Sequence, residues 1–326
     1  MRRITLLPFL LAVACDSGEP ASATDSGAGT DDGLPTLAPP DPSEGFQLMM
    51  QPVVVEPFSE LWWCEVYDAP NTEYAAINRV EFLQNPGTHH MTLSTVTLGG
   101  TRLPEGQLDC TELYGDASLM EDQLMFFGNQ DDAEGVMQLP DKTVADFPPA
   151  LQIIHEVHYV NTTDAPVTLY SYVNAYTIDR DTVEARIWGG QVRDENLSIP
   201  AGGTATEWTR CEMNEDVEVI FLAGHMHEKG TRFTVKPWDG AESGEIFFDN
   251  DDWHNPKITQ YDPPLVIPAG TGFEYACTWE NPTDAEVTYG LTAEDEMCNL
   301  AVVFTPMSTT TLCEVVETSD GVLYTP

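Results

Sequence analysis

The sequence predicts an all-β protein made of two consecutive antiparallel β-sandwich domains, jelly-roll-like in kind, with a cleft between them. Short runs rich in Val, Ile, Thr, Tyr and Phe recur after about residue 45, and Gly, Pro, Asn and Asp separate them. Convincing amphipathic helices are absent, apart from a short helical turn expected near 120–125. The length suits domains over 46–190 and 191–326.

The N-terminus has the pattern of an export signal. Arg2 and Arg3 precede an apolar run over 4–14, and Cys15 follows it. The run is too short to span a bilayer as a stable helix, and the small residues before Cys15 resemble a bacterial lipobox. We expect 1–15 to be a signal peptide with Cys15 lipidated, or a conventional signal cut nearby. Either places the protein outside the cytoplasm, as a cell-envelope lipoprotein or a secreted protein.

The next segment, 16–45, consists mainly of Ser, Gly, Pro, Thr, Ala and acidic residues, without Lys or Arg. Such a segment buries too little apolar surface to fold, so we expect a disordered acidic linker. The formal net charge of −41 argues against nucleic acid and anionic membrane surfaces as partners. A lipid anchor is then the expected membrane contact.

Six cysteines remain after Cys15, and an even number in an exported chain predicts three disulfides. Two precede residue 200 and four follow it, which allows pairing within each half. The sequence alone leaves the connectivity open. The six are Cys64, Cys110, Cys211, Cys277, Cys298 and Cys313.

Six of the seven histidines occur in three close pairs, and clustered imidazoles commonly bind transition metals. His225 and His227 follow an apolar run. Alternate residues of a strand point to the same face, so both rings can bind one ion; a structural pair is the alternative.

The neighbours His89 and His90 form the first pair. Adjacent strand residues point to opposite faces, so both bind one ion only if the backbone departs from a regular strand there. Pro86 and Gly87, just upstream, make such a departure plausible. The alternative is that one of the two histidines binds the ion, while the other lies at the surface or supports a ligand without binding the ion.

The remaining histidines divide into one candidate ligand and two bystanders. His155 and His158 are spaced so that a strand points them to opposite faces, and the pattern favours His158 as the ligand. His155 is then a packed or hydrogen-bonded histidine, and the isolated His254 is expected to be structural.

Four motifs together resemble the signature of the copper type II, ascorbate-dependent monooxygenases, the family of peptidylglycine α-hydroxylating monooxygenase and dopamine β-monooxygenase. The resemblance covers about residues 46–315, and the motifs occur in the family's order. They are His89-His90-Met91, Val157-His158-Tyr159, His225-x-His227 and Glu296-Met297-Cys298-Asn299-Leu300.

The resemblance implies two coppers per chain, each with three protein ligands. One site consists of His89, His90 and His158; the other consists of His225, His227 and Met297, which are also the catalytic residues. The soft thioether of the second site favours Cu(I). By resemblance, the copper of this second site activates O2 to hydroxylate a substrate C–H bond. The all-histidine copper transfers an electron, and ascorbate or an equivalent reductant recharges both. The implied disulfides are Cys64–Cys110, Cys211–Cys313 and Cys277–Cys298.

Departures from the family bear on the substrate. Ala223 and Ala301 stand where the peptide-amidating enzymes carry substrate-binding Arg and Tyr, while Asn299 is retained and Glu156 replaces a Gln. We therefore expect a small molecule or a peptide other than a glycine-extended one, with Asn299 and Glu156 in the substrate pocket. We also expect a monomer. The alternative function is a non-enzymatic copper-binding lipoprotein; a zinc hydrolase fits the methionine less well.

Overall fold

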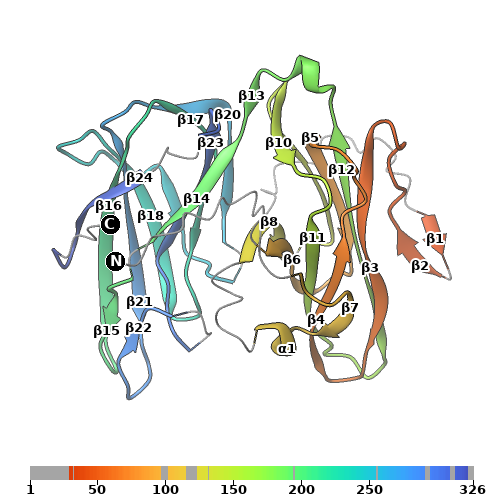
Figure 1. Ribbon diagram of the computed structural model, residues 1–326. Coiled ribbons are helices and arrows are strands. Elements are labelled where there is room, and N and C mark those ends of the chain that lie inside the picture. The colour runs from red at the N-terminus through yellow and green to blue at the C-terminus, as the bar shows by residue number, and fades with distance from the viewer. Residues whose placement is uncertain are drawn as a thin grey trace. The chain divides into compact units, whose positions relative to one another are not determined.

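The computed structural model describes residues 29–31, 33–96, 102–114, 123–130, 132–193, 195–254, 256–290, 294–308 and 313–321 (Figure 1). The expected signal over 1–15, with Cys15, lies outside these residues. Strands make up most of the described chain, which confirms the all-β prediction. The chain divides into two compact units, the first ending at Ile187 and the second beginning at Trp188.

The first unit has two main sheets. Aromatic side chains of the two sheets pack against each other in the core: the ring centroids of Phe82 and Phe127, one from each sheet, are 5.9 Å apart. The strands of one sheet, in spatial order, are β13 (Ala185–Arg186), β10 (Thr143–Phe147), β5 (Ala75–Gln84), β12 (Val167–Thr177) and β3 (Gly45–Val55), with β9 (Glu134–Gln138) also paired to β5. The other sheet has the order β7 (Gly106–Asp109), β4 (Glu60–Asp68), β11 (Gln152–Val160), β6 (Thr88–Val96) and β8 (Gln123–Gln130).

The second unit also has two main sheets, whose apolar side chains form one core that includes Leu222, Phe233, Tyr275, Trp279 and Leu300. One sheet has the order β14 (Trp188–Arg193), β23 (Asn299–Thr305), β17 (Val217–His225) and β20 (Ile258–Ile267). The other has the order β19 (Phe248–Asn250), β18 (Gly230–Trp238), β21 (Gly272–Glu280), β16 (Thr204–Met213) and β24 (Cys313–Thr318). A short pair, β15 (Ser198–Ile199) and β22 (Val287–Thr288), completes the unit.

Two expectations about local structure were wrong. The helical turn expected near 120–125 is not found over 123–125, where β8 begins, and 120–122 lie outside the described residues. The described α-helix, α1, is Cys110–Tyr114. The folded body also begins before residue 45, since β1 (Gly29–Asp31) pairs with β2 (Leu34–Thr36). Leu37 is buried in a cluster with Leu83, and the Asn174 side chain donates to the Ala38 carbonyl at 2.7 Å. The few apolar residues of the supposed linker therefore dock on the first unit.

Three disulfides cross-link the described chain, and each lies within one unit. They are Cys64–Cys110, Cys211–Cys313 and Cys277–Cys298, the pairs that the resemblance implies. Such bridges are typical of extracellular proteins. Among the described residues, no helix is long and apolar enough to cross a membrane.

The two units repeat one corner. After β11 the chain reads VNTTDA over 160–165, and after β21 it reads ENPTDA over 280–285. Asn161 accepts from the backbone N–H and hydroxyl of Thr163 and donates to the Ala165 carbonyl. Asn281 makes the same bonds with Thr283 and Ala285. This shared corner gives a register in which residues of the two units can be compared.

Candidate metal centres

Three imidazoles meet in the first unit. His89 and His90 lie on β6, and His158 of β11 is the cross-strand partner of His90. The ring centroids are 5.0 to 5.3 Å apart, and one nitrogen from each ring lies within 4.8 Å of the others. We refer to His89, His90 and His158 as the triad. Three converging imidazole nitrogens fit a copper ion.

A β-bulge explains how two adjacent histidines join one site. Thr88 pairs with Tyr159 and His90 pairs with His158, which leaves His89 as an extra residue on β6. An extra residue interrupts the alternation of side chains and re-aims them. Gly87 precedes the bulge with a φ of 80°, a conformation that glycine adopts without strain. The backbone departure that a shared site requires is therefore present.

Carboxylates hold two of the triad rings. His90 Nε2 lies 2.8 Å from Glu156 Oε1, and His158 Nε2 lies 2.6 Å from Glu60 Oε1. These contacts occupy the Nε2 atoms, so the Nδ1 atoms of His90 and His158 are left as the candidate ligands. The Nδ1 atoms of His89 and His90 are 3.2 Å apart, close enough to share one cation. Carboxylates bonded to the far nitrogen of a ligating histidine fix its ring and raise its basicity.

Glu156 faces a candidate ligand, so the structure gives no support to its expected place in a substrate pocket. Its side chain is only 9% exposed and contacts His90. Oε1 also accepts from Trp62 Nε1 at 2.7 Å, and Oε2 accepts from Thr92 Oγ1 at 3.3 Å. Alternation along β11 puts Glu156 on the same face as His158, two residues later. These contacts are those of a residue that positions a ligand.

Glu60 is a residue of this centre that sequence reasoning missed. It joins His158 through the pairing of β4 with β11, in which Glu60 is the partner of Val160. Its place in the sequence, before the apolar residues of β4, resembles that of any exposed strand-end acid. No local signal therefore distinguishes it from the many other acidic residues of this chain.

The second candidate centre lies where β17 ends and β23 begins. His225 is the last residue of β17 and pairs with Asn299, the first residue of β23. His227 follows two residues later, with its ring centroid 5.2 Å from that of His225. Met297 precedes Asn299 by two residues. The antiparallel pairing thus gathers the three predicted ligands at one end of these two strands.

The hydrogen bonds of this centre leave nitrogen atoms suited to a metal. His227 Nδ1 lies 3.1 Å from the Asp295 carbonyl oxygen. A carbonyl can only accept, so Nδ1 carries the proton and Nε2 is left as the ligand atom. Burial, and next the adjacent His227, lower the pKa of His225 to about 4. His225 is therefore neutral near pH 7, the form that binds a metal.

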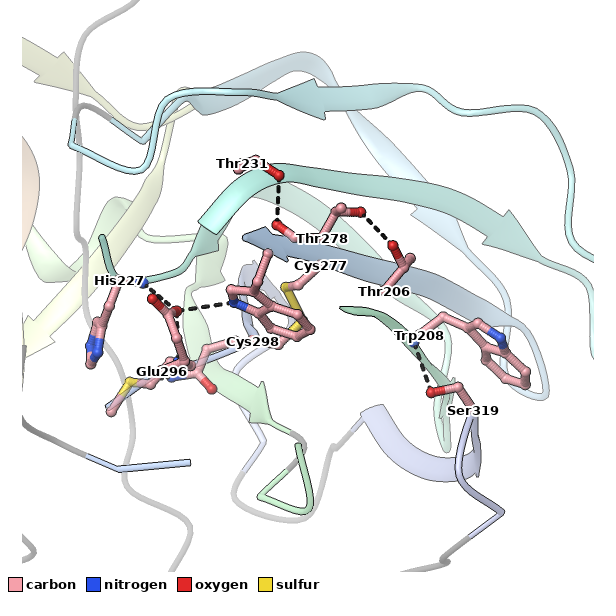
Figure 2. Close-up of a disulfide and its surroundings, with 12 residues drawn as sticks. Thr206, Trp208, His227, Thr231, Cys277, Thr278, Glu296, Cys298 and Ser319 are labelled. Atoms are coloured by element: carbon pink, nitrogen blue, oxygen red, sulfur yellow. Dashed lines mark hydrogen bonds between the residues drawn. A yellow bond between two sulfur atoms is a disulfide. The ribbon is translucent and has the colours of Figure 1, made fainter. Parts of the chain in front are cut away.

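The thioether of Met297 is held from two directions. Asn299 Nδ2 lies 3.1 Å from Met297 Sδ, a contact in which the amide donates to sulfur. The next residue, Cys298, is bridged to Cys277 of β21 (Figure 2). Met297 and Asn299 are both buried. Asn299 Oδ1 has no hydrogen-bond partner within the described chain.

The other two histidines are separate from these centres. His155 is fully buried, with Nε2 2.8 Å from Ser171 Oγ and Nδ1 3.0 Å from Tyr67 Oη. Burial lowers its pKa to about 3, so it stays neutral. His254 is exposed beside Trp253, with ring centroids 5.5 Å apart.

The second unit repeats the triad's backbone without its imidazoles. Gly230 pairs with Trp279 and Arg232 with Thr278, so Thr231 is the extra residue of an equivalent bulge. Thr231 Oγ1 donates to the Thr278 carbonyl at 3.0 Å, and the Thr278 hydroxyl contacts that of Thr206 at 3.0 Å (Figure 2). The fold supplies the bulge in both units, but only the first places histidines on it.

An all-β chain with a histidine triad and a His-x-His pair near a buried methionine has the donor groups that copper proteins use. The model of the copper type II ascorbate-dependent monooxygenase, C-terminal domain, matches residues 189–322. Residues 189–322 therefore belong to this copper- and ascorbate-dependent family as its C-terminal domain, and they contain His225, His227 and Met297. No curated protein matches the chain closely enough to count as a relative.

Proposed function

We propose that the protein is a copper-dependent monooxygenase that hydroxylates a C–H bond of an organic substrate with O2 and an external reductant such as ascorbate. The observation that carries the proposal is the triad, which lies outside the matched domain. The family match concerns the second unit alone. The triad independently supports a second metal site, which a two-copper enzyme needs.

The two donor sets suit different tasks. Bound copper would supply one-electron redox chemistry and activation of O2. His225, His227 and Met297 would hold the ion of the oxygen-activating site, where a thioether favours Cu(I). The triad, with carboxylates behind two of its rings, would hold the ion that passes on an electron. The net reaction inserts one oxygen atom into the substrate, releases the other as water, and consumes two electrons and two protons.

Asn299 is the residue of this chain best placed to contact the substrate. Its Nδ2 is engaged by the Met297 sulfur, while its buried Oδ1 has no partner in the part of the chain described. A buried acceptor without a partner is costly and suits a ligand N–H or O–H. Ala223 and Ala301 offer no charge for a substrate carboxylate, so the proposed substrate is a small molecule or peptide without that requirement.

We further propose that the protein is exported and works as a monomer, with Cys15 lipidated and the segment after it serving as a tether. The disulfides support an oxidising compartment. Mass spectrometry of the mature N-terminus tests the lipid directly.

Oxygen uptake by the copper-loaded protein with ascorbate, scanned over candidate substrates, tests the function. We expect two coppers per chain and substrate-stimulated uptake. Met297→Ile should abolish hydroxylation and leave the triad copper bound, because isoleucine has no ligand atom. Normal product formation by this variant would refute the assigned roles. Copper binding without substrate-coupled uptake would favour the alternative, a non-enzymatic copper-binding lipoprotein.

A further inference from the structure

Glu296 lies between the segments that carry two of the candidate ligands. We propose that Glu296 is a positioning residue, whose buried carboxylate holds the His227 turn and the Met297 backbone in one arrangement. This inference rests on the proposed function of the second centre, since it assumes that His227 and Met297 bind one ion. The residue itself contacts neither imidazole nor sulfur in any hydrogen bond of the described chain.

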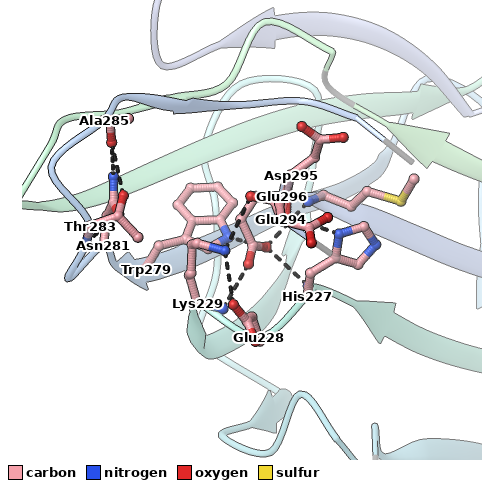
Figure 3. Close-up of polar contacts among 11 residues, drawn as sticks. His227, Glu228, Lys229, Trp279, Asn281, Thr283, Ala285, Glu294, Asp295 and Glu296 are labelled. Atoms are coloured by element: carbon pink, nitrogen blue, oxygen red, sulfur yellow. Dashed lines mark hydrogen bonds and ion pairs between the residues drawn. The ribbon is translucent and has the colours of Figure 1, made fainter. Parts of the chain in front are cut away.

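The carboxylate of Glu296 is 0% exposed and accepts four N–H groups (Figure 3). Oε1 accepts from the Lys229 backbone N–H at 2.7 Å. Oε2 accepts from the His227 backbone N–H at 3.0 Å, from Trp279 Nε1 at 3.0 Å and from the Met297 backbone N–H at 3.3 Å. One side chain thus ties together both ligand-bearing segments and the buried indole of β21.

The disulfide does not make this link. Cys277–Cys298 covalently fixes the start of β23 to β21, in the other sheet, and neither cysteine belongs to the turn after β17. Glu296 is bonded to both ends of that turn, at His227 and Lys229. The neighbouring ammonium of Lys229 is engaged elsewhere, by Glu228 Oε1 and the Glu294 carbonyl, each at 3.1 Å (Figure 3). Within the described chain, backbone and indole N–H groups alone hold the Glu296 charge.

Glutamine cannot replace this carboxylate, because all the groups around it are donors. An amide offers one accepting oxygen and one donating nitrogen. If the amide oxygen takes the place of Oε2, the amide NH2 group faces the Lys229 N–H. If the oxygen takes the place of Oε1, the NH2 group faces the three N–H groups of His227, Trp279 and Met297. Either orientation sets donor against donor. Glu296→Gln should therefore loosen the turn while it keeps the size of the side chain.

Glu274 provides a matched control in the same unit. Its carboxylate on β21 is 7% exposed, and it accepts from Arg210 Nε at 2.8 Å and Lys236 Nζ at 2.7 Å. None of its hydrogen bonds involves a candidate ligand. Glu274→Gln also removes a buried carboxylate charge, here one paired with two cations, and so reports how such a loss affects the unit at a distance from the candidate ligands.

The experiment measures Cu(I) binding to the full chain by competition with a chromophoric chelator, and copper–sulfur scattering by X-ray absorption. Outer partners of metal ligands typically contribute roughly 10–100-fold to affinity. We expect Glu296→Gln to lose affinity in that range at the second centre and to lose the sulfur signal, with the triad copper retained. Glu274→Gln should keep both properties.

A second variant guards against a failure to fold. Glu296→Asp keeps the charge but is one methylene shorter, so it cannot reach Lys229 and His227 together, and we expect an intermediate loss of affinity. Wild-type affinity and a full sulfur signal in the folded Gln or Asp variant would overturn the positioning role. A wild-type protein that binds only one copper, or shows no sulfur ligand, would instead refute the proposed function.

Discussion

Replacing Glu156 by glutamine should change the charge behind the triad and little else. Oε1 accepts from His90 Nε2 and Trp62 Nε1, whereas Oε2 faces the hydroxyl of Thr92. A glutamine oxygen can take the place of Oε1, and its NH2 can donate to the Thr92 oxygen, because a hydroxyl also accepts. All three hydrogen bonds survive in Glu156→Gln. A glutamine should therefore fit the hydrogen-bond partners of Glu156, whereas it should not fit those of Glu296.

The expected energetic effect of Glu156→Gln follows from the loss of the negative charge. Hydrogen bonds to a charged group contribute about 1.5–3 kcal/mol and neutral ones about 0.5–1.5 kcal/mol. Changing the two bonds to Oε1 from charged to neutral should therefore lower the free energy of unfolding by about 2–3 kcal/mol. Copper affinity at the triad should fall roughly 10–100-fold, or about 1.4–2.8 kcal/mol. Cu(II) carries more charge than Cu(I) and should lose more. The reduction potential of the triad copper is therefore expected to rise.

Titration of Cu(II) against a competing chelator and a potentiometric titration of the triad copper provide the assay. Glu60→Gln is the control at the same centre, because the Glu60 side chain is 64% exposed and solvent screens its charge. Its effect should be clearly smaller than that of Glu156→Gln. An unchanged potential in Glu156→Gln, or equal effects of the two variants, would show that the buried carboxylate does not tune the site.

Two further predictions concern stability. Burial lowers the pKa of His155 from an ordinary value of 6.5 to about 3 in the folded protein. Its contribution to the free energy of unfolding is therefore complete above pH 6.5. That contribution is lost as the pH falls from 6.5 towards 3, by up to about 1.4 kcal/mol per pH unit. Urea unfolding at pH 7 and pH 5.5 should show a flatter pH dependence for His155→Gln than for the wild type; parallel profiles would contradict the assignment. Asn161→Ala and Asn281→Ala should each cost about 3 kcal/mol, since each removes a side chain that donates to three carbonyls and accepts twice. Calorimetry that shows a large loss for only one of them would argue against an equivalent corner in the two units.

Strand periodicity predicts the face on which a residue lies, and no more than that. Regular alternation predicts that His225 and His227 share one face of a strand, but β17 ends at His225 and His227 lies just beyond it. The two rings are still neighbours, 5.2 Å apart between centroids. The pair His89-His90 depends on a bulge, and a bulge is set by register between strands that are far apart in sequence. The sequence indicates the condition for a shared site at His89-His90, but only the strand pairing shows that the condition is met.

Side chains that support the ligands are the hardest to predict. The sequence places Glu156 with the substrate because its family counterpart differs, whereas its partner in the structure, His90, lies across a strand pairing. Glu296 is visible in the sequence only as the first residue of a motif. Its partners at His227 and Trp279 come from other segments of the fold. Hydrogen bonds of this kind depend on tertiary contacts that no local pattern encodes.

The shared corner, in contrast, does have a signal in the sequence. The related stretches VNTTDA and ENPTDA, over 160–165 and 280–285, mark the same corner in each unit. They lie a whole unit apart, so they form no short-period repeat. Matching them residue by residue aligns β11 with β21 and makes Thr278 the equivalent of His158. The absence of an imidazole from the second bulge is therefore encoded in the sequence.

The repeated backbone explains why the two centres differ. Thr88 and Gly230 occupy equivalent places beside the two bulges. Three residues earlier in each unit stand Asn85 and His227. Asn85 has a structural role, since its Oδ1 accepts from the Tyr170 N–H at 2.6 Å and its Nδ2 donates to a backbone carbonyl. The first unit therefore has a candidate ligand, His158, where the second has Thr278. The second has a candidate ligand, His227, where the first has the structural residue Asn85. The first unit carries three imidazoles, two of them bonded to carboxylates, whereas in the second unit His227 and the Met297 sulfur are bonded to neutral groups. This chemical asymmetry fits the different redox tasks that we propose for the two copper sites.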